Sequence, residues 1–225
     1  MVNKTIPIII IFSLIACGLH AVMLHMPFNN YLISSIIKII IFVLCPMIFF
    51  ALNGKKHGFA EMFSKGDVKN IKRSFLLGFG VFSVILIIYT IISPYIDKEM
   101  IIDALENNGI NSGNFPLVFI YIVLINALLE EIFFRGFVFM TLYRAGYKHC
   151  AYVYSSLLFA FYHVAILRGA LTPWIFIFCI FGLAVAGLIF NELTVRCKNI
   201  TGSLIVHISA NLSLNLIVVY YLYLK

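Results

Sequence analysis

Three polar clusters interrupt long apolar stretches of this 225-residue chain, and their residue types are those of acid–base chemistry. The clusters are Glu130, Glu131 and Arg135; then His163; then His207 with Asn211. A glutamate can take a proton from water, and a histidine can orient or share that proton. A histidine beside a carboxamide can donate hydrogen bonds to a developing oxyanion. Together these groups are the parts that hydrolysis of a peptide bond needs.

The two adjacent glutamates are expected to differ, because neighbours on a helix point about 100° apart. Glu131 and Arg135 have the i,i+4 spacing of an ion pair, which can neutralise itself without any chemistry. Glu130 has no basic residue one turn away, and Asn126 shares its face of the helix. We therefore expect a Glu130 that is not paired on its own helix and acts as a general base or acid, with a proton relay of a transporter as the alternative.

The two histidines lie on polar stripes of different helices. His163 follows Phe159 by four residues, and on its own it is as readily a packing residue as a catalytic one. The other stripe is a ladder with a step of four residues, consisting of Ser203, His207, Asn211 and Asn215. Such a ladder is also typical of hydrogen bonding between membrane helices. The combination of a carboxylate, two imidazoles and a carboxamide on three helices favours a site over structural contacts.

A metal site is a further interpretation of the same residues. Glu130, His163 and His207 resemble the ligand set of a catalytic zinc, although the HExxH spacing is absent. From these residues alone, chemistry without a cofactor and a divalent metal such as zinc, held by these three side chains, both stay open.

The elements that position these groups are membrane helices. Hydrophobic residues make up 63% of the chain and charged residues 11%, with a mean hydropathy of +1.05. Soluble domains contain roughly 45–50% apolar and 25% charged residues, so a soluble globular protein is excluded. We expect an all-α, polytopic integral membrane bundle of about seven transmembrane helices with short interfacial helices. The expected spans are residues 6–24, 31–52, 75–93, 115–143, 150–167, 174–190 and 200–224.

The chain is expected to form one membrane domain, 1–225, with amino-terminal helices and loops in 1–114 and catalytic helices in 115–225. A competing interpretation of the first span is a lipoprotein signal with a lipidated Cys17. The apolar sequence continues past Cys17 to a full span length, which favours a membrane-spanning helix.

The charged loops predict the orientation in the membrane. The net charge of +7 is concentrated in the polar segment 53–74 and near Arg144, Lys148, Arg196 and Lys198. An acidic segment, 94–114, is expected as a loop on the opposite side. By the positive-inside rule the amino terminus is cytoplasmic, and the excess of basic residues reports topology, so no nucleic-acid partner is expected. Lys38 stands alone within the second span, where we expect its ammonium to snorkel towards the interface, with a pair to a buried acid or a contact with lipid phosphate as the alternatives.

A family resemblance emerges from three of these motifs. Glu130-Glu131-Ile-Phe-Phe-Arg135 resembles an EExxxR motif, Phe159-Ala-Phe-Tyr-His163 an FxxxH motif and His207-Ile-Ser-Ala-Asn211 an HxxxN motif. In this order they resemble those of the CPBP intramembrane proteases, which include the CaaX prenyl endopeptidase called Ras-converting enzyme and bacterial Abi-type proteins. The resemblance covers about residues 115–215.

The resemblance implies an intramembrane endopeptidase in which Glu130 and His163 activate water while His207 and Asn211 stabilise the oxyanion. Glu131, Arg135 and Phe159 are then supporting residues, and we favour a mechanism without a cofactor, with a divalent metal such as zinc as the alternative. The implied partners are membrane lipids and a peptide or membrane-protein substrate, and the residue usage favours a bacterial cell membrane. The alternatives are a non-catalytic immunity or regulatory scaffold that binds a toxin or sensor in the membrane, and a proton-coupled carrier.

Overall fold

The computed structural model describes residues 2–24, 26, 30–53 and 58–223, with side chains from residue 6 onward, and every regular element in these ranges is helical. The elements are α1 (Val2–Leu24), α2 (Tyr31–Leu52), α3 (Gly58–Glu61), α4 (Val68–Ile92), η1 (Ser93–Tyr95), α5 (Lys98–Asn107), α6 (Phe115–Ile120), η2 (Tyr121–Asn126), α7 (Ala127–Glu130), η3 (Glu131–Phe139), α8 (Met140–Arg144), α9 (Lys148–Leu167), α10 (Pro173–Cys197) and α11 (Thr201–Tyr223). The all-α fold class is confirmed.

Seven helices are long and apolar enough to cross a membrane, which agrees with a polytopic integral membrane protein. They comprise Ile6–Leu24, Tyr31–Leu52, Val68–Tyr95, Phe115–Arg144, Lys148–Leu167, Pro173–Cys197 and Thr201–Tyr223. The third and sixth helices are longer than expected, because hydropathy marks only their apolar parts. The polar first turns of α4 follow the N-cap Asp67, which accepts a hydrogen bond from the backbone of Asn70.

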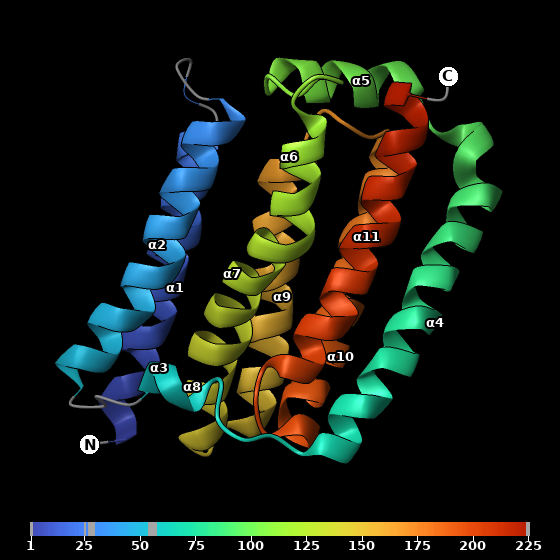
Figure 1. The fold of residues 1–225 in the computed structure, drawn as a ribbon. Helices are drawn as coiled ribbons and strands as arrows, with labels where there is room; N and C mark the ends of the chain where they lie inside the picture. The colour runs from blue at the N-terminus through green and yellow to red at the C-terminus, as the bar shows by residue number, and fades with distance from the viewer. Residues whose placement is uncertain (1, 25, 27–29, 54–57, 224–225) are drawn as a thin grey trace.

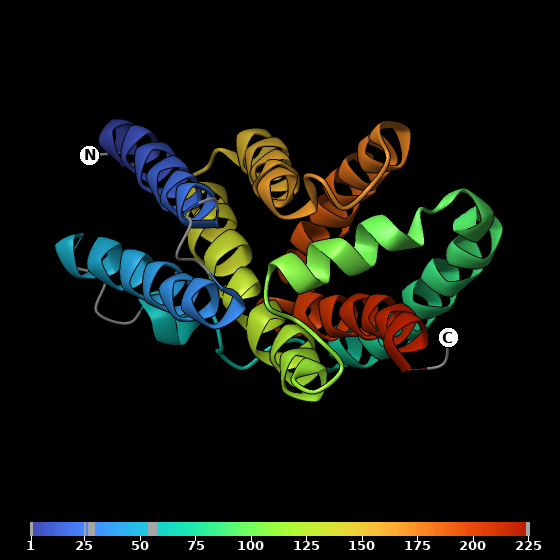
Figure 2. The same cartoon turned by 90° about the horizontal axis from the view of Figure 1, so that it is seen from above.

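The spans run alternately up and down, so the amino terminus lies at the lower end of Figure 1 and the carboxyl terminus at the upper end. Seen from above, α1 and α2 lie on one side of the bundle and α4 on the other, beside α11 (Figure 2). The expected cytoplasmic position of the amino terminus stays a prediction, as does the division of the chain at residue 114.

One prediction about the segment between the third and fourth spans was wrong. Residues 94–114 were expected to form an acidic loop, but they contain α5, which lies across the upper end of the bundle in Figure 1. Asp97 caps this helix by accepting hydrogen bonds from the backbone N–H groups of Glu99 and Met100. A short amphipathic helix with a weak apolar face is easily mistaken for a polar loop. Tyr95 of η1 and Trp174 of α10 form an edge-to-face ring pair with centroids 6.1 Å apart.

The core that fixes the polar helices is largely aromatic. Phe42 of α2 stacks on Phe133 of η3, with ring centroids 4.3 Å apart. Phe134 meets Phe159 of α9 edge to face at 5.3 Å. All four rings are at most 1% exposed. These contacts join the helix that carries the two glutamates to α2 through Phe133 and to α9 through Phe134.

Candidate active site

The helix that carries Glu130 and Glu131 departs from regular α-geometry on both sides of this pair. Residues 115–144 form one continuous helix, but η2 and η3 are π-helical, with i→i+5 hydrogen bonding. π-Helical stretches are rare, and many occur at functional sites. Glu130 ends α7 and Glu131 begins η3, so the two carboxylates sit at a change of helical geometry.

One oxygen of Glu130 is fixed by two donors. Lys38 Nζ lies 2.5 Å from Glu130 Oε1, and Asn126 Nδ2 donates to the same oxygen at 3.1 Å. Lys38 also donates to Asn126 Oδ1 at 2.5 Å. Lys38 and Glu130 are 4% and 1% exposed, so this is a buried ion pair within the membrane-spanning region.

This pair decides between the alternatives for Lys38. Glu130 has no basic partner on its own helix, as expected, but it pairs with Lys38 of another helix, so Lys38 pairs with a buried acid and does not snorkel. Lys38 is instead directed into the bundle from α2, 92 positions earlier in the chain. The signal was present in the sequence, because Lys38 is the lone formal charge of its span. Sequence spacing reports partners on one helix and not on a distant one.

The other oxygen of Glu130 faces the two histidines. Glu130 Oε2 is 3.4 Å from His207 Nε2 and 3.8 Å from His163 Nε2, and it accepts no hydrogen bond. His163 Nδ1 lies 2.8 Å from the backbone carbonyl of Phe159, which can only accept. The proton of a neutral His163 therefore sits on Nδ1, and its Nε2 lone pair points towards Glu130. Both predicted histidines thus place their Nε2 atoms within 3.8 Å of Oε2 of Glu130, the carboxylate predicted as the base.

Glu131 supports the second histidine. Its Oε1 lies 2.9 Å from His207 Nδ1 and 3.3 Å from Arg135 Nη1, so the ion pair expected from the i,i+4 spacing is present. Glu131 and Arg135 are fully buried. The guanidinium of Arg135 lies between two rings, 4.2 Å from the Phe159 centroid and 4.8 Å from that of Phe190. Phe159 therefore touches both His163 and Arg135, the latter through its ring face.

Asn211 lies apart from this cluster in its hydrogen bonding. Its Nδ2 donates to the backbone carbonyl of Ile122, in the π-helical stretch η2, at 3.0 Å. The side-chain amide of Asn211 has a second N–H, which this hydrogen bond does not use. Asn215, the next rung of the ladder, donates back to the Asn211 carbonyl at 2.8 Å, which makes it a local structural contact.

Two further buried groups near the cluster were not among the predicted site residues. His20 Nδ1 and Tyr162 Oη have no hydrogen-bond partner in the structure, and their rings lie 5.3 Å apart. Lys38 Nζ lies 5.0 Å from the Tyr162 centroid. Tyr162 sits next to His163 in the chain, but a single tyrosine in an aromatic-rich helix carries no signal by itself.

The preference for chemistry without a metal ion stays a prediction, and two features of the donor set support it. Within the described ranges, no three His, Cys, Asp or Glu side chains are arranged to hold one. The Glu130 carboxylate, the one anionic member of the expected ligand set, already carries the Lys38 ammonium. That ammonium neutralises the negative charge which would attract a divalent cation.

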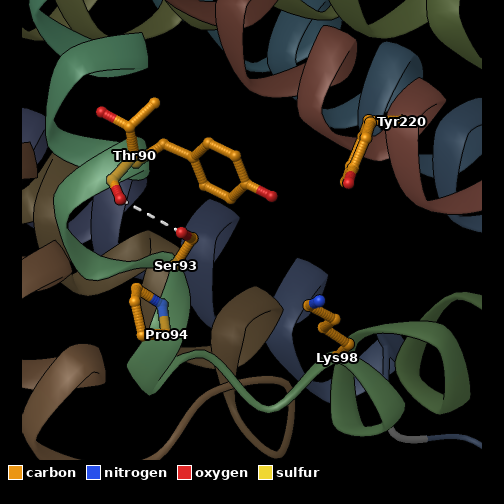
Figure 3. Close-up of a pocket in the computed structure, with 6 residues that line it drawn as sticks. Thr90, Ser93, Pro94, Lys98 and Tyr220 are labelled. Carbon is orange, nitrogen blue, oxygen red and sulfur yellow. Dashed lines mark hydrogen bonds between the residues drawn. The ribbon is translucent and has the colours of Figure 1, made fainter. Parts of the chain in front are cut away.

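A separate open pocket of about 280 Å³ lies at the upper end of the bundle, between α4, α5 and α11 (Figure 3). It is lined by Tyr89, Thr90, Ser93, Pro94, Lys98 and Tyr220. Ser93 Oγ donates to the backbone carbonyl of Thr90 at 3.1 Å there. The pocket shares no residue with the cluster around Glu130.

Comparison with known protein families places the cluster within one matched region. Residues 112–213 match the family described as Type II CAAX prenyl endopeptidase Rce1-like. No curated protein and no solved structure matched the chain. The matched region contains Glu130, Glu131, Arg135, His163, His207 and Asn211, whereas Lys38 and His20 lie outside it.

Proposed function

We propose that this chain is an intramembrane endopeptidase that uses a glutamate-activated water, because its residues 112–213 match the family described as Type II CAAX prenyl endopeptidase Rce1-like. Its substrates are membrane-associated peptides or protein tails. The family implies a peptidase in general terms, and the residues around Glu130 suggest how this chain would hydrolyse the bond.

The observation that carries the proposal is the state of Glu130 Oε2. This oxygen is buried, accepts no hydrogen bond and faces the Nε2 atoms of His163 and His207. A buried acceptor without a donor is costly, so it is rare without a function. A water molecule between these three atoms can donate one proton to Glu130 and the other to His163 Nε2.

Hydrolysis then follows in two steps. The water oxygen attacks the carbonyl carbon of the scissile bond while one water proton passes to Glu130 Oε2. This forms a tetrahedral intermediate with a negative oxygen. When the carbon–nitrogen bond breaks, Glu130 returns the proton to the leaving nitrogen, so the products are an acid and an amine and the carboxylate is restored.

The oxyanion is stabilised from α11. His207 Nδ1 is directed at the Glu131 carboxylate, which orients the ring. The negative charge of Glu131 also stabilises the positive charge that the ring has when Nε2 carries a proton as well. From Nε2, 3.4 Å from Glu130 Oε2, His207 donates to the negative oxygen. Asn211 contributes through the N–H that is not given to Ile122. Arg135 holds Glu131 in place.

The chemistry proposed for this chain is free of metal and of other cofactors, since Lys38 and Arg135 supply fixed cations beside the two glutamates. We further propose that the amino terminus is cytoplasmic and that the host membrane is a bacterial cell membrane. The basic residues near the lower ends of the helices support this orientation.

The test compares wild type, Glu130→Gln and Glu192→Gln in detergent on a library of membrane peptides, read by mass spectrometry with and without a strong chelator. Glu192 lies on α10 in an exposed pair with Arg196, so its variant controls for loss of a carboxylate. We expect cleavage by wild type and Glu192→Gln, none by Glu130→Gln, and no chelator effect. Cleavage by Glu130→Gln would reject the mechanism. Cellular function retained by Glu130→Gln, with no cleavage by any variant, would favour the scaffold.

A further inference from the structure

A positively charged side chain from outside the matched region enters the site. Lys38 lies on α2, whereas the family match begins at residue 112. It is 4% exposed, and its neighbours besides Asn126 and Glu130 include the rings of Phe42 and Tyr162, 5.3 and 5.0 Å from Nζ. An ammonium flanked by aromatic faces and bound to a carboxylate is held in one place.

The contacts of Lys38 select one oxygen of Glu130. Lys38 and Asn126 both donate to Oε1 of Glu130. Lys38 also donates to the side-chain oxygen Oδ1 of Asn126, so the three side chains form a closed hydrogen-bond network. The network fixes the plane of the carboxylate. Oε2, left without a donor, is therefore the oxygen directed at His163 and His207.

We propose that Lys38 is a positioning residue of the active site, which holds Glu130 by Oε1 so that Oε2 receives the proton of the attacking water. This inference rests on the proposed function. It makes α2 part of the catalytic unit, although the three sequence motifs all lie on later helices.

The first measurement separates positioning from folding by steady-state kinetics on a cleaved peptide, per folded enzyme. Lys38→Met removes the charge and keeps a similar length, Lys38→Arg keeps the charge, and Lys148→Met is the control. Lys148 is exposed and also lies over a tyrosine ring, 5.5 Å from the Tyr143 centroid.

We expect Lys38→Met to lower kcat about 100-fold while KM changes by less than about threefold, because a small displacement of a catalytic group affects the reaction step. Lys38→Arg should recover about tenfold of that loss, and Lys148→Met should match wild type. A kcat of Lys38→Met within about threefold of wild type overturns the proposal. So does an equal loss in Lys38→Met and Lys38→Arg.

A second measurement needs no substrate. The melting temperature in detergent is compared for Lys38→Met alone and combined with Glu130→Gln. If Lys38 holds Glu130, the decrease caused by Lys38→Met is less than half as large in the Glu130→Gln background. Equal decreases in both backgrounds overturn the proposal. Equal cleavage of the peptide by wild type and Glu130→Gln would reject the proposed function and not the role of Lys38. In that case the melting temperatures still decide whether Lys38 holds residue 130.

Discussion

The chain contains the same Glu-x-x-x-Arg spacing in two regions with opposite surroundings. Glu131 and Arg135 are fully buried, and their pair is 3.3 Å long. Glu192 and Arg196, near the lower end of α10, approach to 2.6 Å with both side chains exposed. The shorter pair is the less important one, because water screens it and competes for its hydrogen bonds. Burial and neighbours therefore distinguish a supporting pair of a site from a surface pair, and spacing does not.

The largest contrast is expected from breaking each pair at its glutamate. Glu131→Gln leaves Arg135 as an uncompensated buried charge and should lower the free energy of unfolding by about 3–5 kcal/mol. Glu192→Gln keeps an amide oxygen that can accept from the Tyr152 hydroxyl and should lower the free energy of unfolding by less than about 1 kcal/mol. Unfolding in mixed detergent, followed by circular dichroism, measures both.

Equal effects of the two variants would show that Arg135 is compensated by groups other than Glu131. The double variant Glu131→Gln/Arg135→Met serves as the control. It removes both charges and should recover part of the stability that Glu131→Gln loses.

A smaller contrast is expected between two glycines of α10. A Cβ at Gly187 would lie 2.8 Å from the Cα of Ser156 on α9, whereas nothing lies within 4 Å of one at Gly182. Gly187→Ala should therefore cost about 1–3 kcal/mol by forcing α9 and α10 apart. Gly182→Ala should be neutral, or stabilising by up to about 1 kcal/mol, because alanine favours helix. The same unfolding assay decides, and a neutral Gly187→Ala would contradict the close α9–α10 contact.

The smallest contrast concerns the aromatic surroundings of the buried pair. Phe190 lies 4.8 Å from the Arg135 guanidinium and is 3% exposed, whereas Phe181 on the same helix is 69% exposed. Phe190→Leu keeps most of the side-chain volume but removes the ring face, and should cost about 1 kcal/mol. Phe181→Leu is the matched control and should match wild type in the same assay. A similar loss of unfolding free energy in Phe190→Leu and Phe181→Leu would show that the effect comes from helix packing and not from the Arg135 contact.

Much of the fold could be predicted because the membrane sets the length and hydropathy of each span. The second span was expected at 31–52 and is observed as Tyr31–Leu52. The acidic segment was misjudged because α5 is a helix of only 10 residues that carries several charges, so hydropathy gives no signal for it. The π-helical geometry of η2 and η3 also escaped prediction, because periodicity near four residues does not separate it from an α-helix.

The site was predictable where its partners share one helix. Asn126 and Glu130, and likewise Glu131 and Arg135, meet as their four-residue spacing indicates. The Lys38–Glu130 pair joins two helices that no motif connects, so only the packing of α2 on the carboxylate helix reveals it. The catalytic roles of these residues stay predictions until the variants above are measured.

The ring pair of Tyr95 and Trp174 has a practical consequence for spectroscopy. Trp174 is the single tryptophan of the chain, and it is 55% exposed at the upper end of α10. Tryptophans at such positions sit at the membrane interface. Intrinsic fluorescence therefore reports the polarity at one rim of the bundle, and quenchers placed at known lipid depths would locate that rim within the bilayer. Binding at Glu130 requires a second, introduced fluorophore.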